Sequence, residues 1–213
     1  MSRYITPFNL FLFLIALVAA YAVWLMYENW RFHQNLREVA PGHVVAANAP
    51  QSETIDVIMF YDYSCPHCLA ADPIIHQAIA EDGKTNLIYK FIGFFGERSV
   101  RTGKLAYAGG QQDAFMDVHQ YIMTHPETPF EEDDVREMAA ELGLDADQLL
   151  EDMNSRTAAR TLEENLDVSH SMNMRATPAF LINGWPFIPY KSMPDVEGFQ
   201  EMFDRARGGQ PLM

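Results

Sequence analysis

Cysteine is scarce in this chain: its 213 residues include only two, Cys65 and Cys68. Two cysteines cannot complete a four-cysteine zinc site or an iron–sulfur site. A c-type haem attachment site would need histidine after the second cysteine, but that residue is Leu69. A disulfide between Cys65 and Cys68 would close too short a loop to remove much chain entropy, so a purely structural bridge is a poor explanation. A catalytic or metal-handling pair remains, and redox catalysis is the favoured interpretation.

Basic residues are also few, since 15 Lys and Arg stand against 29 Asp and Glu and leave a net charge of -14. Nucleic-acid binding needs a basic footprint, so no nucleic-acid partner is expected. The same balance argues against electrostatic docking on anionic lipid. Hydrophobic residues make up 48% of the chain, which is enough to build the core of one sizeable domain.

Charge is missing altogether between Tyr4 and Tyr27. Residues 10–27 would span about 27 Å as a helix, close to the hydrocarbon thickness of a bilayer. We therefore predict that residues 1–27 form an uncleaved signal anchor. The alternative is a cleaved signal peptide, because Ala20-Tyr21-Ala22 offers small residues at a suitable spacing. The apolar run continues past that point to Met26, which favours the anchor.

The flanking charges do not settle the orientation of this segment, so compartment is inferred from chemistry. A dithiol pair that donates oxidising equivalents belongs outside the cytoplasm. We expect an inner-membrane protein whose catalytic domain lies in the periplasm, or a soluble periplasmic protein if the signal is cleaved.

Residues 28–53 are predicted to form a juxtamembrane helix, which Pro41-Gly42 ends, and a linker. One side of this helix, continued back into the end of the apolar span, carries the apolar residues Leu25, Phe32, Leu36 and Val39. With Asn29 they resemble two heptads of a coiled coil, so a homo-oligomer through residues 25–39 is an alternative. A helix without a partner is favoured, because two heptads are a weak signal.

Residues 54–207 carry the patterns of a mixed α/β domain. The first part is a strand–helix–strand unit: Thr54–Tyr61, the helix after Cys68, and Asn86–Phe91. The last part is a strand, a hairpin turn, a strand and a helix: Ala179–Ile182, Asn183-Gly184, Trp185–Tyr190 and Pro194–Arg207. Between these two parts, a helical insertion is expected at about residues 97–172. Its expected helical segments are Val100–Thr124, a helix that begins at Thr128-Pro129, one capped by Asp145, and Arg156–Ser171.

The Cys65-Pro66-His67-Cys68 motif lies where the first strand gives way to the helix. A disulfide exchanger needs an exposed thiolate that attacks and a second thiol that resolves the mixed disulfide. Cys65 is expected at the helix N-terminus, where free N–H groups favour negative charge, and Cys68 one turn later and more buried. His67 can favour the Cys65 thiolate, and Pro66 stiffens the turn. Only Cys65, Cys68 and His67 are available as ligands near the motif, so no metal site is predicted.

Thr177-Pro178 directly precedes a strand, far in sequence from the cysteines. Thioredoxin folds, which this chain resembles, place a cis-proline facing the active site at such a position. The resemblance therefore implies a cis peptide bond at Thr177-Pro178, with the Thr177 backbone available to pair with an extended substrate, and a trans proline at the entry to the strand is the alternative.

Four segments in this order resemble the DsbA-like thioredoxin family over about residues 54–207: FYDYSCPHC, AYAGGQQDAFMDVH, AELGLDADQL and RATPAFLING. The resemblance implies a thioredoxin fold with an inserted all-helical subdomain, here preceded by a transmembrane helix. It implies disulfide donation to reduced or unfolded exported proteins and reoxidation by a membrane quinone-linked partner. The redox-active Cys65–Cys68 disulfide then replaces any cofactor. By this match Cys65 is the nucleophile, Cys68 the resolving cysteine, His67 the tuning residue, and Thr177-Pro178 the substrate-binding loop.

The chain departs from the family pattern at two positions. Met59 stands where the family often has a buried acid, so proton transfer at Cys68 would need water or another group. Thr177 stands where the best-known monomeric oxidant has valine, and threonine is common in the isomerase branch. Two alternatives to the oxidase therefore stay open: an oligomeric disulfide isomerase or reductase, and a non-enzymatic tethered chaperone that uses the same groove.

Overall fold

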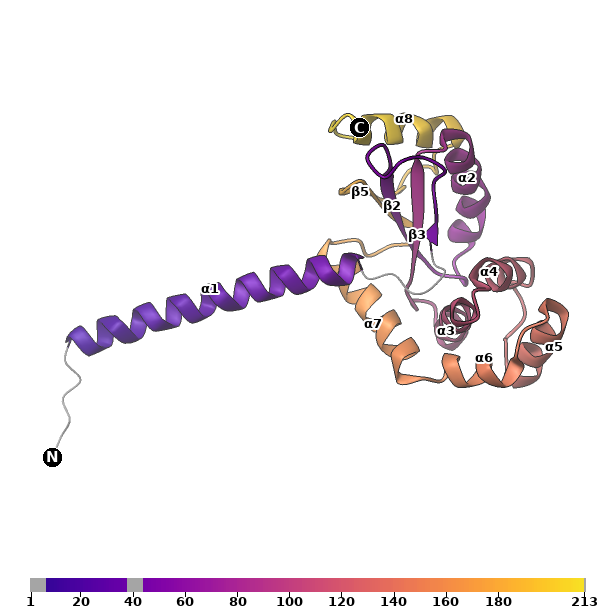
Figure 1. The fold of residues 1–213 in the computed structure, drawn as a ribbon, viewed down its shortest axis with the longest axis horizontal. Helices are drawn as coiled ribbons and strands as arrows, with labels where there is room; N and C mark the ends of the chain where they lie inside the picture. The colour runs from indigo at the N-terminus through magenta and orange to yellow at the C-terminus, as the bar shows by residue number, and fades with distance from the viewer. Residues whose placement is uncertain (1–6, 38–43, 213) are drawn as a thin grey trace. The chain divides into compact units, whose positions relative to one another are not determined.

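The computed structural model describes residues 7–37 and 44–212. The chain divides into two compact units, residues 1–38 and 39–213, which are described separately (Figure 1). The described part of the first unit is helical, and that of the second combines a five-stranded sheet with seven helices.

The described residues of the first unit form the 31-residue helix α1 (Pro7–Arg37). No glycine or proline follows Pro7 within it, so nothing in the sequence breaks the helix where we expected a boundary between residues 27 and 28. Its segment Leu10–Glu28 has a mean hydropathy of 2.4 and is long and apolar enough to cross a membrane, by length and composition alone. The alternative of a coiled-coil seam falls outside the described residues, which do not include Val39, the side chains of Asn29, Phe32 and Leu36, or Pro41-Gly42.

The second unit is built on a sheet with the strand order β1-β3-β2-β4-β5. Its strands are β1 (Val44–Val45), β2 (Ile55–Tyr61), β3 (Thr85–Phe91), β4 (Ala179–Ile182) and β5 (Trp185–Phe187). Among the strands in the described residues, only the β2–β3 pair is parallel, as a strand–helix–strand unit requires. In the β2–β4 register Phe60 pairs with Ala179, so the loop before β4 lies beside the end of β2.

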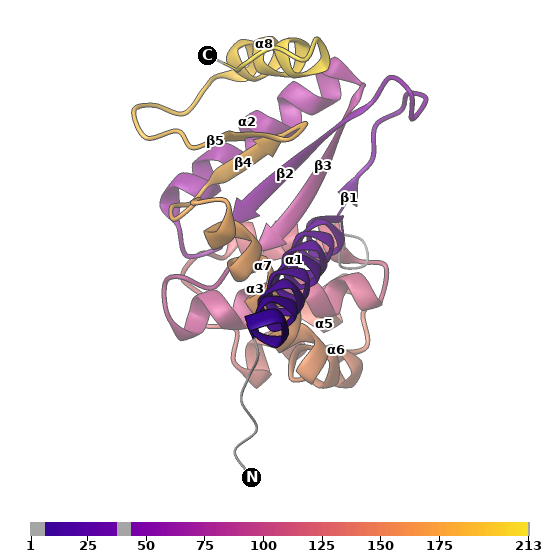
Figure 2. The same ribbon diagram turned by 90° about the vertical axis from the view of Figure 1, so that its left-hand side faces the viewer.

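Two helices, α2 (Pro66–Asp82) and α8 (Val196–Arg207), contact each other and pack on the sheet, with β2 in front of α2 in Figure 2. Successive strand residues point to opposite faces. Met59 and Tyr61 therefore join the main core, while Lys90 meets Asn165 of α7 (Arg156–Ser171) on the other face.

The helical insertion comprises α3 (Glu97–Gln111), α4 (Phe115–Thr124), α5 (Glu132–Leu142), α6 (Ala146–Met153) and α7. The expected segment of residues 100–124 is two helices, because Asp113 between them has a left-handed φ of 56°. The helix expected from Thr128-Pro129 begins only at Glu132, since Phe130 has a φ of 54°. Asp145 caps α6 as predicted, accepting a hydrogen bond from the Gln148 backbone N–H.

Aromatic rings fill the junction between α2, the sheet and the insertion. The rings of Tyr63 and Phe91 stack with centroids 4.9 Å apart, and Tyr89 lies 4.9 Å from the ring of His119 in α4. All four side chains are buried, so the insertion shares one core with the sheet.

Candidate active site

The Cys65-Pro66-His67-Cys68 motif forms the start of α2, directly beyond β2. Cys65 is the N-cap, with an extended backbone, and its carbonyl accepts hydrogen bonds from the backbone N–H groups of Cys68 at 3.0 Å and Leu69 at 3.1 Å. Pro66 occupies the first turn, where its missing N–H costs no helical hydrogen bond. This geometry places the Cys65 Sγ at the positive end of the helix dipole.

The two thiols have opposite pKa perturbations. A hydrogen bond from the Cys68 thiol is the largest cause that lowers the pKa of Cys65, from an ordinary 9.0 to about 5, against the opposing effect of burial. Thr177 and the backbone N–H groups of Cys68 and His67 add to it. Burial and the neighbouring Cys65 raise the pKa of Cys68 far above its ordinary value. At neutral pH the reduced pair is therefore a Cys65 thiolate beside a Cys68 thiol.

Both cysteines are buried, Cys65 being 2% and Cys68 0% exposed. The expectation that Cys65 is exposed is therefore wrong for this conformation, although Cys68 is the more buried of the two, as predicted. The covering group is Thr177, whose carbonyl oxygen lies 3.4 Å from the Cys65 Sγ. A partner thiol must approach through the groove beside this contact.

The Thr177–Pro178 peptide bond is cis, the isomer that the sequence predicts. The Thr177 hydroxyl is buried and has no hydrogen-bond partner among the described residues. A buried hydroxyl without a partner carries a desolvation cost unless a charge uses it. The Thr177 hydroxyl lowers the pKa of Cys65. The Cys65 thiolate can therefore accept the hydrogen bond that the hydroxyl does not donate to any other group.

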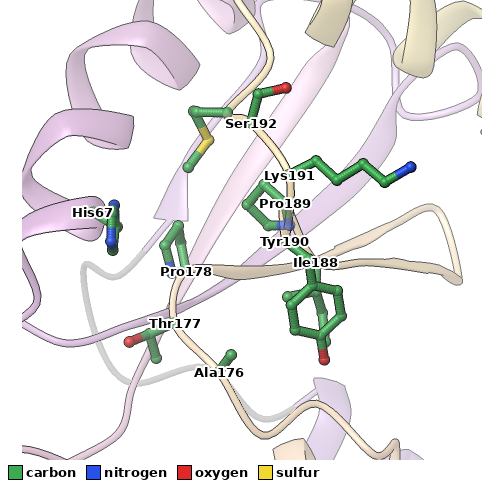
Figure 3. Close-up of a pocket in the computed structure, with 10 residues that line it drawn as sticks. His67, Ala176, Thr177, Pro178, Ile188, Pro189, Tyr190, Lys191 and Ser192 are labelled. Atoms are coloured by element: carbon green, nitrogen blue, oxygen red, sulfur yellow. The ribbon is translucent and has the colours of Figure 1, made fainter.

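A groove of about 420 Å³ opens between the motif and the cis-proline loop. Figure 3 shows His67 on one side, Pro178 in the centre, and the segment that follows β5 on the other side. The lining residues are His67, Ala176, Thr177, Pro178, Ile188, Pro189, Tyr190, Lys191, Ser192 and Met193. Of the site residues identified from the sequence, His67, Thr177 and Pro178 line this groove. Cys65 lies beside it, in contact with the Thr177 carbonyl, and Cys68 is buried behind Cys65.

The imidazole of His67 lines this groove, and no hydrogen bond joins it to Cys65 in the described part of the chain. The contribution of His67 to the lowered pKa of Cys65 comes through its backbone N–H. Among the causes of the lowered pKa of Cys65, His67 therefore acts through its backbone position in the first turn of α2.

Sequence analysis missed Asp62, which holds the loop between β2 and Cys65. This carboxylate is 2% exposed and accepts hydrogen bonds from the Ser64 and Phe94 backbone N–H groups, both at 2.8 Å, and from the Ser99 hydroxyl. The Asp-x-Ser spacing after a strand is a signal for such a turn and could have identified the first of these bonds.

Arg98 of α3 also supports this loop. Its Nη1 donates to the Ser64 Oγ at 3.2 Å, and its Nε donates to the Thr128 carbonyl at 2.9 Å. The insertion therefore braces the residues before Cys65, a contact that no local pattern in the sequence indicates. Met59 is fully buried in the apolar core, so no acid occupies that position.

Comparison with known proteins agrees with this architecture. Residues 56–203 match the DSBA-like thioredoxin domain family. The thiol:disulfide interchange protein DsbA of Pectobacterium carotovorum subsp. carotovorum is 22% identical over 147 residues, which cover 66% of this chain and 71% of that protein.

Two solved structures share the fold. A thioredoxin-like oxidoreductase from Silicibacter pomeroyi DSS-3 has a TM-score of 0.67 and 25% identity, covering 78% of this chain and 91% of that one. The catalytic domain of Proteus mirabilis ScsC has a TM-score of 0.66 and 19% identity, covering 83% and 94%. Because the family match spans more than half of the sequence and includes both cysteines, this chain belongs to the DSBA-like thioredoxin domain family of thiol–disulfide oxidoreductases.

Proposed function

We propose that this protein donates the Cys65–Cys68 disulfide to reduced or unfolded exported proteins through a mixed disulfide. The observation that carries the proposal is the opposite pKa perturbation of the two thiols, with Cys65 lowered to about 5 and Cys68 raised. A stabilised thiolate favours the reduced form of the pair, and the more stable the reduced form is, the more oxidising the pair is.

The reaction balances with two substrate thiols and no other redox group. One substrate thiolate attacks the Cys65 Sγ, the Cys65–Cys68 bond breaks, and the Cys68 sulfur takes up a proton. The second substrate thiolate then attacks the substrate sulfur of the mixed disulfide and expels Cys65 as a thiolate. The substrate loses two electrons and two protons, the enzyme pair gains the electrons and one proton, and the other proton passes to water. Cys65 is the better leaving group in this second step because of its low pKa.

In the reverse direction the same groups have the roles of nucleophile and resolving thiol. The Cys65 thiolate attacks a substrate disulfide, and Cys68 resolves the mixed disulfide. The groove lined by His67, Thr177 and Pro178 is the proposed site for the extended substrate segment. The Thr177 carbonyl, which faces Cys65, is positioned to accept a backbone hydrogen bond from such a segment.

We infer that α1 anchors the protein in the inner membrane and that the catalytic unit lies in the periplasm. The length and hydropathy of Leu10–Glu28 support the anchor, and the chemistry of disulfide donation supports an oxidising compartment. A quinone-linked membrane protein is the proposed oxidant that regenerates the disulfide. Protease treatment of intact and permeabilised spheroplasts tests the orientation: digestion of the catalytic unit in intact spheroplasts is expected, and protection there contradicts it.

The direct test uses the oxidised full-length protein in detergent and a reduced peptide with two cysteines. We expect stoichiometric oxidation of the peptide, with formation of free Cys65 and Cys68. The variants Cys65→Ala and Cys68→Ala, which cannot hold the disulfide, are expected to be inactive. Failure of the oxidised wild type to oxidise the peptide contradicts the proposal.

Disulfide isomerisation is the second candidate function, because Thr177 stands before the cis-proline, where threonine is common in the isomerase branch of the family. The redox state in cells separates the two functions: an oxidase is mostly oxidised, and an isomerase or reductase mostly reduced. Full cellular function of Cys65→Ala would instead support a chaperone that uses the groove without turnover.

A further inference from the structure

A cluster of possible metal ligands lies at the junction of α2 and α4. Asp72 and His76 are one helical turn apart on α2, and His119 projects from α4. One ligand atom from each residue lies within 4.8 Å of the other two. The side chains of Asp72 and His119 are only 8% and 1% exposed, whereas that of His76 is 27% exposed and leaves a route from solvent.

The distances in this cluster suit a small tetrahedral ion. Zinc bonds of about 2.0–2.2 Å to nitrogen and oxygen place neighbouring ligand atoms about 3.3–3.6 Å apart. Asp72 Oδ2 lies 3.3 Å from His119 Nε2 and 3.8 Å from His76 Nε2. Both imidazoles thus direct a nitrogen at the same carboxylate oxygen, and the longer distance belongs to the more exposed His76. The His76 and His119 ligand atoms lie within 4.8 Å of each other, so His76, the more exposed residue, would move toward the other two to complete the three-ligand geometry.

Two buried tyrosines make hydrogen bonds to the Asp72 and His119 side chains on the side away from the shared ligand atoms. The Tyr89 hydroxyl donates to Asp72 Oδ1 at 2.5 Å, which leaves Oδ2 facing the imidazoles. The Tyr63 hydroxyl lies 2.8 Å from His119 Nδ1, the nitrogen turned away from Asp72. With an ion on Nε2, the Nδ1–H of His119 donates to this hydroxyl oxygen. Outer partners of this kind fix the orientation of metal-binding histidines and carboxylates.

We propose that Asp72, His76 and His119 bind one divalent ion of the zinc type, with water as the fourth ligand. Two imidazoles and one carboxylate form a set that suits zinc and its first-row neighbours. The site links α2, whose first turn carries the two cysteines, to α4 of the helical insertion. Sequence analysis predicted no metal site because it considered only ligands near the CxxC motif, and His119 is 43 residues beyond His76.

Without an ion, the same side chains satisfy one another. His76 Nε2 lies 2.6 Å from the Tyr89 hydroxyl, and His119 Nε2 is within hydrogen-bond distance of Asp72. A purely hydrogen-bonded anchor is therefore the competing explanation, and it predicts no metal affinity.

The experiment uses the full-length protein with the Cys65–Cys68 disulfide closed, so that the thiols cannot bind metal. After removal of metal with a chelator, the protein is titrated with Zn²⁺ and Co²⁺, and binding, thermal stability and the cobalt spectrum are recorded. His76→Gln removes one ligand. His125→Gln is the matched control, since it removes an exposed histidine at the end of α4 and leaves the cluster intact.

We expect one equivalent of metal to bind the wild type and His125→Gln and to raise their melting temperatures. His76→Gln is expected to lose at least about 10-fold in affinity, as loss even of a supporting residue costs about 10–100-fold. No binding by the oxidised wild type, or equal binding by His76→Gln, overturns the proposal. If His76→Gln does not fold, X-ray absorption of the zinc-loaded wild type decides: two imidazole ligands support the site, and fewer than two overturn it.

Discussion

The hydrogen bond from the Cys68 thiol to Cys65 can be tested through the pKa of Cys65, because two substitutions of Cys68 separate the effect of this bond from the other causes of the lowered pKa. Cys68→Ala removes the donor, whereas Cys68→Ser retains a hydroxyl donor at the same position. The hydrogen bond is the largest cause of the lowered pKa of Cys65, about 5 in the wild type. The alanine variant is therefore expected to raise the pKa of Cys65, and the serine variant to leave it near the wild-type value.

The size of the change follows from the strength of the bond. A hydrogen bond to a charged group contributes about 1.5–3 kcal/mol, and about 1.4 kcal/mol corresponds to one pKa unit. The pKa of Cys65 should thus rise to about 6–7 in Cys68→Ala. At pH 6 the thiolate fraction would fall from about 90% to about 10–50%.

The assay is the pH dependence of iodoacetamide alkylation of the reduced protein, followed by mass spectrometry, with thiolate absorbance at 240 nm as a second readout. Each variant contains one reactive cysteine, so the titration belongs to Cys65. The reasoning is refuted if Cys68→Ala titrates like the wild type, or if the serine and alanine variants shift equally.

Three further outcomes follow from the same contacts. Thr177→Val, which removes the buried hydroxyl, should raise the pKa of Cys65 by less than Cys68→Ala does in the same alkylation assay, because Thr177 is a smaller cause. The pKa of Cys65 in the folded protein lies below its ordinary value, so the Cys65 thiolate stabilises the folded, reduced protein. This contribution to the free energy of unfolding is lost as the pH falls toward and through about 5, where the thiolate takes up a proton. Urea unfolding should show a loss of about 2 kcal/mol between pH 7 and pH 5 that is absent in Cys65→Ala. Asp62→Asn should lower the free energy of unfolding by about 1–3 kcal/mol in urea, since it weakens three hydrogen bonds to a buried carboxylate. An unchanged midpoint would exclude a bracing role.

The sheet and most helices could be predicted because local patterns and the fold agree there. The β-branched and aromatic runs at residues 55–61, 85–91 and 179–182 form the central strands, and Asn183-Gly184 turns with positive φ at both residues, as its sequence indicates. The strand expected to reach Tyr190 ends at Phe187 instead. Proline has no backbone N–H to donate, so Pro186 and Pro189 weaken this strand.

Contacts between distant segments were beyond the sequence patterns. Burial of Phe130 accompanies its left-handed backbone and delays the start of α5, an effect that no helix-start signal shows. Arg98 meets the loop before Cys65 only because the insertion folds against it. The contact between Asp72 and His119 likewise depends on how α2 and α4 pack together, so no local pattern in the sequence predicted it. Local chemistry therefore located the cysteines and the family resemblance located the cis-proline loop, while their supporting residues required the structure.

The reduction potential of the Cys65–Cys68 pair tests the central claim most directly. Thioredoxin, whose reactive cysteine has a pKa of about 7, has a potential of about -270 mV. At pH 7 a cysteine pKa of about 5 stabilises the reduced form about 50-fold more than a pKa of about 7 does, which is equivalent to about 50 mV for a two-electron couple. Equilibration of the full-length protein with glutathione at pH 7 should therefore give a potential of about -220 mV or higher. A potential of about -270 mV or lower would contradict disulfide donation as the function of this site.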